Sequence, residues 1–325
     1  AAMDVVGNPS SVHAEGRAAR GIVERARGQV AALVGCKPGE VVFTSGATEA
    51  ANILNHFGVW AANTSHDALF AFDGGSGEAF AMGLANSETG VITPAPERTA
   101  DGWPCVGQNG VAKYLLLDVT QAVGRIPWSF HWSGADFAVL SSHKLGGPKG
   151  AGALLVKDGT NTEPVLYGGG QELGRRSGTE NVIGIAGFGA ACEAAQRDLD
   201  AGVWDEVEKL RNILEYALAS GAKETIFVGK GAPRLPNTSC FATPGWKGET
   251  QVMQMDLAGF AVSSGSACSS GKVKVPRVLK AMGLNDRAAE GALRVSLGPT
   301  TTEDEVLRFS ETWLRHEKKF RQRAA

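Results

Sequence analysis

The sequence has little that would mark a membrane-spanning, secreted or nucleic-acid-binding protein. Its 32 basic and 34 acidic residues leave a formal net charge of -2, without the clustered basic surface that nucleic acid or an anionic membrane requires. The longest apolar runs, such as Tyr114–Leu117 and Gly152–Val156, are strand-sized and far below a membrane span. The first residues, Ala1–Pro9, lack the basic and apolar stretches of a secretory signal. We therefore expect a cytoplasmic protein with no nucleic-acid partner and no membrane partner.

Cysteine is scarce and irregularly spaced. The five cysteines are an odd number with no C-x-x-C pair, which predicts neither a disulfide framework nor a zinc site. We predict no resident metal. By base rate, four of the five are inert core thiols, and Cys192 in a helical stretch and Cys240 in a strand are expected to be buried.

The chain has enough apolar residues for a large core. With 325 residues, 43% of them hydrophobic, more than one lobe is expected. Apolar positions at helical spacing predict a helix over Ser11–Val34, with Gly35 as its left-handed cap. Apolar runs without alternation predict strands buried on both faces, at Glu40–Thr44, Tyr114–Asp118, Phe137–Ser141 and Gly152–Val156. Strands separated by helical stretches indicate an α/β fold with a doubly wound, mainly parallel sheet.

The pattern changes near residue 200. Ala201–Ser220 reads as a charged amphipathic helix, and shorter strands follow near Phe227, Thr238–Phe241, Phe260–Ser264 and Ala292–Leu297. A final helix begins at Thr302, where Glu305 has the spacing of a capping box. We therefore predict a large domain over residues 1–199, and a smaller α+β domain over 200–325 to which the N-terminal segment contributes.

Three polar residues lie at or just beyond the ends of apolar strands: Thr48, Asp118 and Lys144. Ligands of open parallel sheets bind beyond the carboxyl ends of the strands. Asp118 ends an apolar run, where a buried carboxylate requires a cation to offset its desolvation. A strand-end aspartate taken alone is more often a turn or cap residue, so its weight comes from the other two.

Lys144 and the stretch Ser45–Thr48 suggest the ligand. A lysine beside apolar walls has a depressed pKa, which favours a Schiff base with an aldehyde. Ser45–Thr48, at the start of a helical stretch, offers N–H groups and a hydroxyl to a phosphate. With Asp118, these residues predict a site for a phosphorylated aldehyde that has a protonated ring nitrogen.

Seven motifs in order along the chain resemble those of the NifS/IscS-type cysteine desulfurases. They are Gly7–His13, Phe43–Glu49, Asp118–Gln121, Ser142–Gly150, Gly168–Glu172, Arg176–Asn181 and Ser263–Cys268. The resemblance implies a pyridoxal 5'-phosphate (PLP) enzyme of fold type I. It would have a sheet of the seven-stranded type, a smaller C-terminal domain, and a homodimeric state.

The resemblance also implies roles for single residues around the cofactor. Lys144 would be the Schiff-base lysine, and Asp118 would keep the pyridinium nitrogen protonated so that the ring acts as an electron sink. Further contacts are implied for Gln121 at the phenolic oxygen, for Thr48, Ser141, His143 and the Ala47 N–H at the phosphate, and for Thr179 at the phosphate of the neighbouring subunit.

On the substrate side, the resemblance implies that Cys268 takes sulfur from L-cysteine. The thiolate would attack the substrate sulfur, L-alanine would leave, and Cys268 would hold a persulfide. His66 would stack on the ring as a general acid/base. Arg294 would grip the substrate carboxylate, and Asn8 would also contact the substrate. A sulfur acceptor or iron–sulfur scaffold protein would be the partner, with Cys268 making transient contact with sulfur or a cluster.

The sequence departs from the family pattern in three places. It begins just before Gly7, without the family's N-terminal strand motif. Between Asn52 and Asn86 it is shorter by about a strand and a helix. Ser87 stands where the family has a second asparagine, which usually contacts the phenolic oxygen.

Two alternatives stay open on the sequence. One is another fold-type-I PLP enzyme, such as a selenocysteine lyase, an aminotransferase or a kynureninase-like hydrolase, against which the Cys268 motif argues. The other is a catalytically silent scaffold subunit, which the shortened centre and Ser87 would favour.

Overall fold

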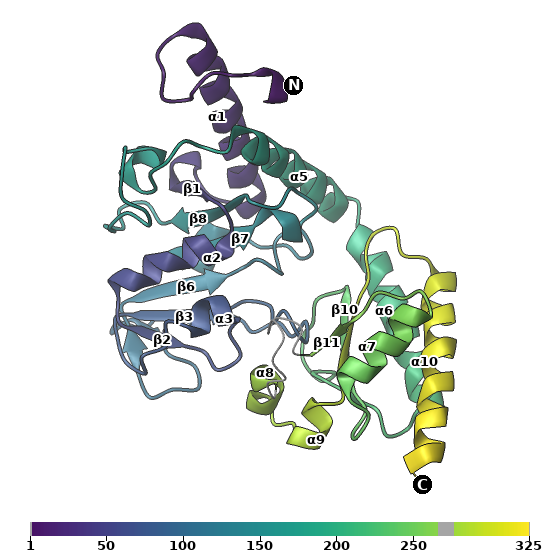
Figure 1. Ribbon diagram of the computed structural model, residues 1–325. Helices are drawn as coiled ribbons and strands as arrows, with labels where there is room; N and C mark the ends of the chain where they lie inside the picture. Colours follow the sequence, from purple (N-terminus) through teal and green to yellow (C-terminus); the bar gives the residue numbers. More distant parts are fainter. Residues whose placement is uncertain (1, 266–275, 325) are drawn as a thin grey trace. The chain divides into compact units, whose positions relative to one another are not determined.

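The computed structural model describes residues 2–265 and 276–324 of the chain (Figure 1). The chain divides into two compact units, of which the second is Asn86–Thr93 together with Gly202–Ala325. The sequence predicted a boundary between residues 199 and 200, but it gave no sign that Asn86–Thr93 belongs with the C-terminal part. Within the described residues, no helix is both long and apolar enough to span a bilayer.

The first unit is built on a six-stranded sheet with the order β1-β8-β7-β6-β3-β2. Neighbouring strands from β7 to β2 are parallel, and β8 is antiparallel to both β1 and β7. The strands are β1 (Val41–Thr44), β2 (Val59–Ala61), β3 (Ala79–Gly83), β6 (Tyr114–Asp118), β7 (Phe137–Ser141) and β8 (Gly152–Val156). The doubly wound, mainly parallel α/β architecture is thus confirmed.

The number of strands differs from the expectation of a seven-stranded sheet. The region between Asn52 and Asn86 holds most of η3 (Ala51–His56), then β2, the short helix α3 (Asp67–Phe70) and β3. This is the region in which the sequence is shorter than the family pattern by about a strand and a helix. The described residues therefore form six strands in this sheet.

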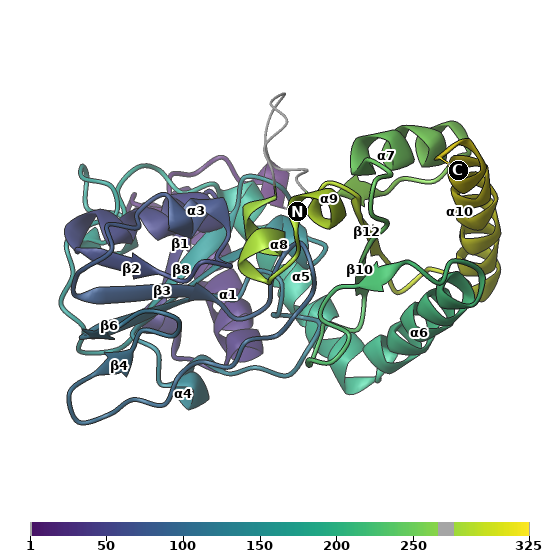
Figure 2. The same ribbon diagram turned by 90° about the horizontal axis from the view of Figure 1, so that it is seen from below.

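Helices cover both faces of the sheet. On one face, Phe43 of β1 contacts Phe188 of α5 (Val182–Asp200), and α1 (Ala14–Val34) runs beside α5 (Figures 1 and 2). On the other face, Val42 packs with Ile53 and Leu54, which belong to η3 (Ala51–His56). Because successive strand residues point to opposite faces, both faces need apolar side chains, which explains the unbroken apolar runs.

The remaining elements of this unit are short. They are η1 (Ala2–Asp4), η2 (Pro38–Glu40), α2 (Ala47–Ala50), β4 (Trp103–Pro104), β5 (Val111–Ala112), α4 (Phe130–Ser133), η4 (Ser142–Lys144) and η5 (Glu172–Gly174). The sequence assigned the N-terminal segment to the smaller domain, but η1 packs against α5 in the first unit. The predicted cap of α1 is confirmed, since Gly35 has a φ of 60° and its N–H donates to the carbonyl of Ala31.

The second unit is an antiparallel sheet with the order β11-β12-β10-β9, packed with helices. Its elements are α6 (Val203–Gly221), β9 (Ile226–Phe227), β10 (Thr238–Ala242), α7 (Gly248–Leu257), β11 (Ser263–Ser264), α8 (Arg277–Ala281), α9 (Asp286–Ala289), β12 (Ala292–Ser296) and α10 (Glu303–Ala324). Its core centres on Trp313, whose ring lies edge-on to Phe241 and whose Nε1 donates to Gln251. The predicted capping box is confirmed by hydrogen bonds between Thr302 and Glu305 in both directions.

The segment Asn86–Thr93 is bound to the second unit by backbone hydrogen bonds. The N–H of Ile92 donates to the carbonyl of Pro233 at 2.8 Å, and the N–H of Leu235 donates to the carbonyl of Gly90 at 2.7 Å. Val91 and Arg234 form an isolated antiparallel bridge. Strand pairing over so few residues leaves no periodic signal in the sequence, which is why it was not predicted.

Replacing Trp313 with alanine should destabilise the second unit. The side chain is 0% exposed, so Trp313→Ala leaves a cavity and an unpaired Gln251 oxygen, which should cost about 3 to 5 kcal/mol. Denaturant unfolding of the full chain measures the change. The matched control is Trp132→Ala, because Trp132 is 90% exposed and its loss should change the unfolding free energy by less than about 0.5 kcal/mol. Equal effects of the two substitutions would contradict this description of the core.

Candidate active site

Asp118 and Lys144 follow neighbouring strands at the same edge of the sheet. β6 ends at Asp118, which pairs with Val139 of β7, and β7 leads directly into the turn η4 that contains Lys144. Asp118 is half-buried, and one carboxylate oxygen accepts the N–H of Thr120 at 2.9 Å. That hydrogen bond occupies only one of the two carboxylate oxygens, and a carboxylate at this position is suited to a cationic ligand group.

The turn Ser45–Thr48 packs against Gly152 at the start of β8 and is hydrogen-bonded to Ser141 at the end of β7. The N–H of Ala47 donates to Oγ of the buried Ser141 at 2.8 Å. This close approach depends on Gly152 of β8, because a Cβ there would lie 2.5 Å from the Cα of Gly46. A side chain at residue 152 would therefore push the turn away from the strand ends.

The turn that carries Lys144 is hydrogen-bonded to Arg125, which lies in the turn after β6. Arg125 donates to the carbonyl of Gln121 and to the carbonyl of Lys144, so one guanidinium joins the turns after β6 and β7. Burial lowers the pKa of Arg125 to about 10, and the group still carries its charge at neutral pH. Gln121 is half-buried, and both His143 and Lys144 are exposed.

His143 lies in a positive environment. Although the side chain is largely exposed, partial desolvation of the ring lowers the pKa of His143, and the charges of Lys144 and Lys149 lower it further. The imidazole is therefore neutral at neutral pH and can act as either a hydrogen-bond donor or an acceptor. A neutral ring beside two lysines is compatible with binding an anion such as a phosphate.

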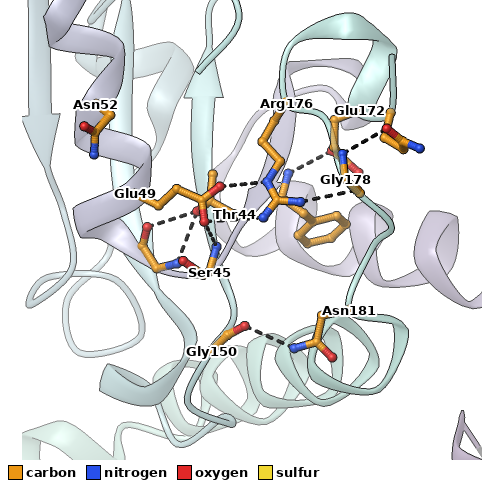
Figure 3. Close-up of polar contacts among 12 residues, drawn as sticks. Thr44, Ser45, Glu49, Asn52, Gly150, Glu172, Arg176, Gly178 and Asn181 are labelled. Carbon is orange, nitrogen blue, oxygen red and sulfur yellow. Dashed lines mark hydrogen bonds and ion pairs between the residues drawn. The ribbon is translucent and has the colours of Figure 1, made fainter. Parts of the chain in front are cut away.

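A segment from Gly168 to Asn181 carries Thr179 and is anchored through Glu172 (Figure 3). The buried carboxylate of Glu172 accepts two hydrogen bonds from Arg27, at 2.7 and 2.9 Å, and a third from the N–H of Phe43 at 2.8 Å. Glu172 has a φ of 50°, in the left-handed region that non-glycine residues rarely adopt. The three hydrogen bonds offset the cost of holding this conformation.

Two further contacts anchor the same segment (Figure 3). Arg176 forms an ion pair with Glu49 of α2, with 2.7 Å between Nε and Oε1. Asn181 donates from Nδ2 to the carbonyl of Gly150, in the loop that follows Lys144, at 3.1 Å. Thr179 is exposed between these two anchors.

The other candidate residues of the first unit lie at the ends of local elements. Thr48 is exposed, and its carbonyl accepts a hydrogen bond from Asn52. His66 caps α3, since its Nδ1 accepts the N–H of Ala68 at 3.1 Å. Asn8 is exposed, and its Oδ1 accepts the N–H of Ser10 at 2.9 Å.

In the second unit, Arg294 of β12 holds two other candidate regions together. Its Nη1 donates to the carbonyl of Ser87 at 2.8 Å, and its Nη2 donates to Oγ of Ser263 at 3.2 Å. Its Nε is buried without a hydrogen-bond partner among the described residues. An orphaned N–H on a guanidinium that is already oriented favours binding of a carboxylate.

The four cysteines in the described part of the chain are all free thiols. Burial raises the pKa of both Cys36 and Cys240 to about 12, and it also raises that of Cys105 and Cys192. These thiols stay protonated at neutral pH and are poor nucleophiles. The expectation that Cys192 and Cys240 are buried is confirmed. Cys268 lies outside the described residues.

Sequence reasoning missed the residues that hold the site in place. Arg27, Glu49, Arg125 and Glu172 look like ordinary charged residues in the sequence, because their partners are distant along the chain or are backbone atoms. The only signal was indirect: Glu49, Glu172 and Arg176 lie inside the motifs that carried the resemblance.

Comparison with known proteins gives a consistent result. Residues 2–67 and 78–309 match the family model of the class-V aminotransferases. A cysteine desulfurase of Enterobacter agglomerans is 35% identical over 93% of this chain and 84% of its own length. One from Frankia sp. is 38% identical over 92% of this chain and 82% of its own, and the IscS of Dictyoglomus turgidum is 33% identical over 92% and 84%.

Solved structures of NifS-like proteins are similar to this chain in fold. A NifS-like protein has a TM-score of 0.80 at 29% identity, covering 96% of this chain and 92% of its own. Another from Rickettsia africae has a TM-score of 0.81 at 26% identity, covering 98% and 93%. The stretch 68–77, which the family model does not match, falls within the shortened region between Asn52 and Asn86.

Removing the cation from the buried Arg27–Glu172 pair should be costly. Arg27→Met leaves the Glu172 carboxylate, whose side chain is 1% exposed, without its counter-ion and should destabilise the first unit by about 3 to 5 kcal/mol. The double variant Arg27→Met/Glu172→Gln should lose less, because the amide oxygen still accepts from Phe43 and no charge is buried. Arg20→Met, at an exposed position of the same helix, is the control for denaturant unfolding. A double variant less stable than Arg27→Met would be inconsistent with a charge effect.

The titration of His143 tests the positive environment of the Lys144 turn. By NMR, its ring should titrate below the ordinary value of 6.5, since partial desolvation and two lysines disfavour the protonated form. Lys149→Met removes one of these charges and should raise the midpoint. Lys113→Met, an exposed lysine beside Tyr114, should leave it unchanged. If the titration midpoint of His143 is the same in Lys149→Met as in the wild type, this electrostatic description is wrong.

Proposed function

The chain belongs to the class-V aminotransferase family and, within it, to the cysteine desulfurases, and on this premise we propose that it takes sulfur from L-cysteine onto Cys268 and releases L-alanine. The observation that carries the proposal is the 33 to 38% identity to cysteine desulfurases across more than nine-tenths of the chain. The arrangement of Asp118, Ser141 and Lys144 at adjoining strand ends supports it independently.

PLP is the cofactor of this family, and the residues present fit it. A half-buried carboxylate with a spare oxygen suits a protonated ring nitrogen, and Asp118 provides one. The close approach of Ala47 to Ser141, which Gly152 permits, brings a hydroxyl and a turn of backbone together where a phosphate can bind. Lys144 lies two residues beyond the buried Ser142, on the turn that Arg125 braces.

Each residue has a distinct proposed role toward the cofactor. When bound, the cofactor supplies an electron sink beside the α-carbon of the substrate. Lys144 would bind its aldehyde carbon covalently, and Asp118 would hold the ring nitrogen. Gln121 would donate to the phenolic oxygen, with Ser87 as a second candidate there. The phosphate would be held by Ala47, Thr48, Ser141 and His143, and by Thr179 from the neighbouring subunit.

On the substrate side, Arg294 would bind the carboxylate of L-cysteine with its remaining N–H groups, and Asn8 would help to orient the substrate. The bonds to Ser87 and Ser263 fix the plane of the guanidinium before the substrate arrives, which reduces the ordering cost of binding. Lys144 Nζ and His66 would carry the proton from the α-carbon.

Cys268 would be the sulfur acceptor. Its thiolate sulfur forms a bond with the substrate sulfur, the bond between that sulfur and the β-carbon breaks, and the carbon fragment takes the electron pair and protons to leave as alanine. The high pKa values of the four described cysteines support this choice, because none of them is suited to act as a thiolate.

The assembly that we propose is a homodimer that passes sulfur to an acceptor or iron–sulfur scaffold protein in the cytoplasm. Large apolar side chains of the first unit support an interface: Val6, Val12 and Leu173 are 89%, 86% and 79% exposed. Leu173 and Pro9 also line a cavity of about 300 Å³.

Two variants separate cofactor binding from sulfur transfer. Cys268→Ala should keep the visible absorption of the bound cofactor but lose cysteine-dependent alanine formation by roughly a thousandfold or more. Lys144→Ala should abolish the lysine-linked absorption and any borohydride label at that residue. Cys36→Ala, at a half-buried position, is the control and should keep both properties.

Undiminished alanine formation in Cys268→Ala would refute the persulfide mechanism and favour another PLP enzyme. A wild-type protein that remains colourless with added cofactor would favour a silent scaffold subunit instead. Mass spectrometry after incubation with cysteine locates the additional sulfur and tests Cys268 directly.

A further inference from the structure

Glu49 joins two segments of one chain that are each proposed to bind a phosphate: the turn Ser45–Thr48 in its own subunit, and Thr179 in the neighbouring subunit. One of its oxygens accepts the N–H of Ser45 at 2.8 Å, which fixes the turn Ser45–Thr48 from inside. The other accepts Nε of Arg176 at 2.7 Å, and Nη2 of the same guanidinium lies 3.4 Å from the first oxygen (Figure 3). The carboxylate thus links a turn and a segment that are 127 residues apart in the chain.

Arg176 extends this link toward Thr179. Its Nη1 donates to the carbonyl of Gly178, next to Thr179, at 3.3 Å. Gly178 has a φ of 104°, and its N–H donates to Oε1 of Gln171 at 2.9 Å. The backbone on the N-terminal side of Thr179 is therefore set by the guanidinium that Glu49 holds.

The Glu49–Arg176 pair is sheltered enough to matter energetically. The two side chains are only 21% and 19% exposed. Burial alone would raise the pKa of Glu49, but the hydrogen bonds and charge of Arg176, together with those from Ser45, hold it below its ordinary value. The carboxylate is consequently ionised at neutral pH, and a charge-assisted pair of this kind is stronger than a neutral hydrogen bond.

We propose that Glu49 and Arg176 are positioning residues that set the turn Ser45–Thr48 and the segment Arg176–Thr179 jointly for phosphate binding. The inference rests on the proposed function, because it requires the turn Ser45–Thr48 to bind the cofactor phosphate of its own subunit and Thr179 to bind that of the neighbouring subunit. Neither residue needs to contact the phosphate: breaking the pair removes one anchor from each segment while leaving every proposed phosphate ligand in the chain.

The test compares two ligands that differ only in the phosphate. Apoenzyme carrying Glu49→Gln is titrated with PLP and with pyridoxal, following absorbance. We expect the dissociation constant for PLP to rise about tenfold and that for pyridoxal to stay within twofold, because pyridoxal has no phosphate to be positioned. Inorganic phosphate should also compete less well with PLP in the variant.

The matched control lies at the other end of the same strand. Glu40 precedes β1, as Glu49 follows it, and accepts the N–H groups of Lys37 and Asp158 and a nitrogen of His131. Glu40→Gln makes the same chemical change away from the turn and should leave both dissociation constants unchanged. Denaturant unfolding of both apoproteins shows whether any effect of Glu49→Gln exceeds general destabilisation.

A second pair of variants keeps the proposal testable if Glu49→Gln folds poorly. Arg176→Lys retains a charge but loses the planar fork, and it should weaken PLP binding less than Arg176→Met. Of the single variants Glu49→Gln and Arg176→Met, one will have the lower affinity for PLP. The double variant Glu49→Gln/Arg176→Met should have an affinity no lower than that, since both substitutions break the same contact.

The outcomes are distinct. Unchanged PLP binding in Glu49→Gln, or equal weakening for PLP and pyridoxal, overturns the positioning role while leaving the proposed function intact. Wild-type protein that binds neither ligand overturns the proposed function, and the positioning role with it. Selective loss of PLP affinity in Glu49→Gln but not in Glu40→Gln supports the proposal.

Discussion

The buried carboxylate of Glu172 is the contact on which the rest of the candidate site depends. It lies between Arg27 of α1 and the N–H of Phe43, and so it ties the segment Gly168–Asn181 to a helix and a strand at once. A buried charge of this kind contributes little net stability but is costly to leave unpaired, so it specifies one arrangement of the chain. The left-handed conformation of Glu172 and Leu173 persists because these bonds determine it.

The site is assembled in layers of decreasing burial. Apolar strands place Asp118 and Ser141 at neighbouring ends, glycine at residue 152 lets the turn Ser45–Thr48 approach them, and charged side chains then fix the exposed segments. Each layer has a different physical basis, namely burial of apolar area, absence of a side chain, and charge pairing. Groups proposed for the cofactor come mainly from the first unit, whereas Arg294 and Ser87 belong to the second.

Sequence patterns predicted the parts of this fold whose signal is local. Four strands of the main sheet, the cap at Gly35 and the capping box at Thr302 follow from burial periodicity and backbone chemistry, and all are confirmed. The extent of β11 was overestimated, because only Ser263–Ser264 pairs with β12, and the N–H of Phe260 donates instead to the carbonyl of Met255. The pairings of Arg27 with Glu172 and of Arg176 with Glu49 span 145 and 127 residues, and nothing local encodes them. The roles of the individual site residues remain predictions.

The segment Asn86–Thr93 has a consequence for synthesis on the ribosome. It precedes Pro233–Leu235, to which it is hydrogen-bonded, by about 140 residues, so its partners are translated roughly 7 to 28 seconds later at usual elongation rates. During this interval Asn86–Thr93 lies between two parts of the first unit in the sequence, while its own hydrogen-bond partners have not yet been translated. The nascent chain therefore carries this segment without its hydrogen-bond partners until its C-terminal third is translated.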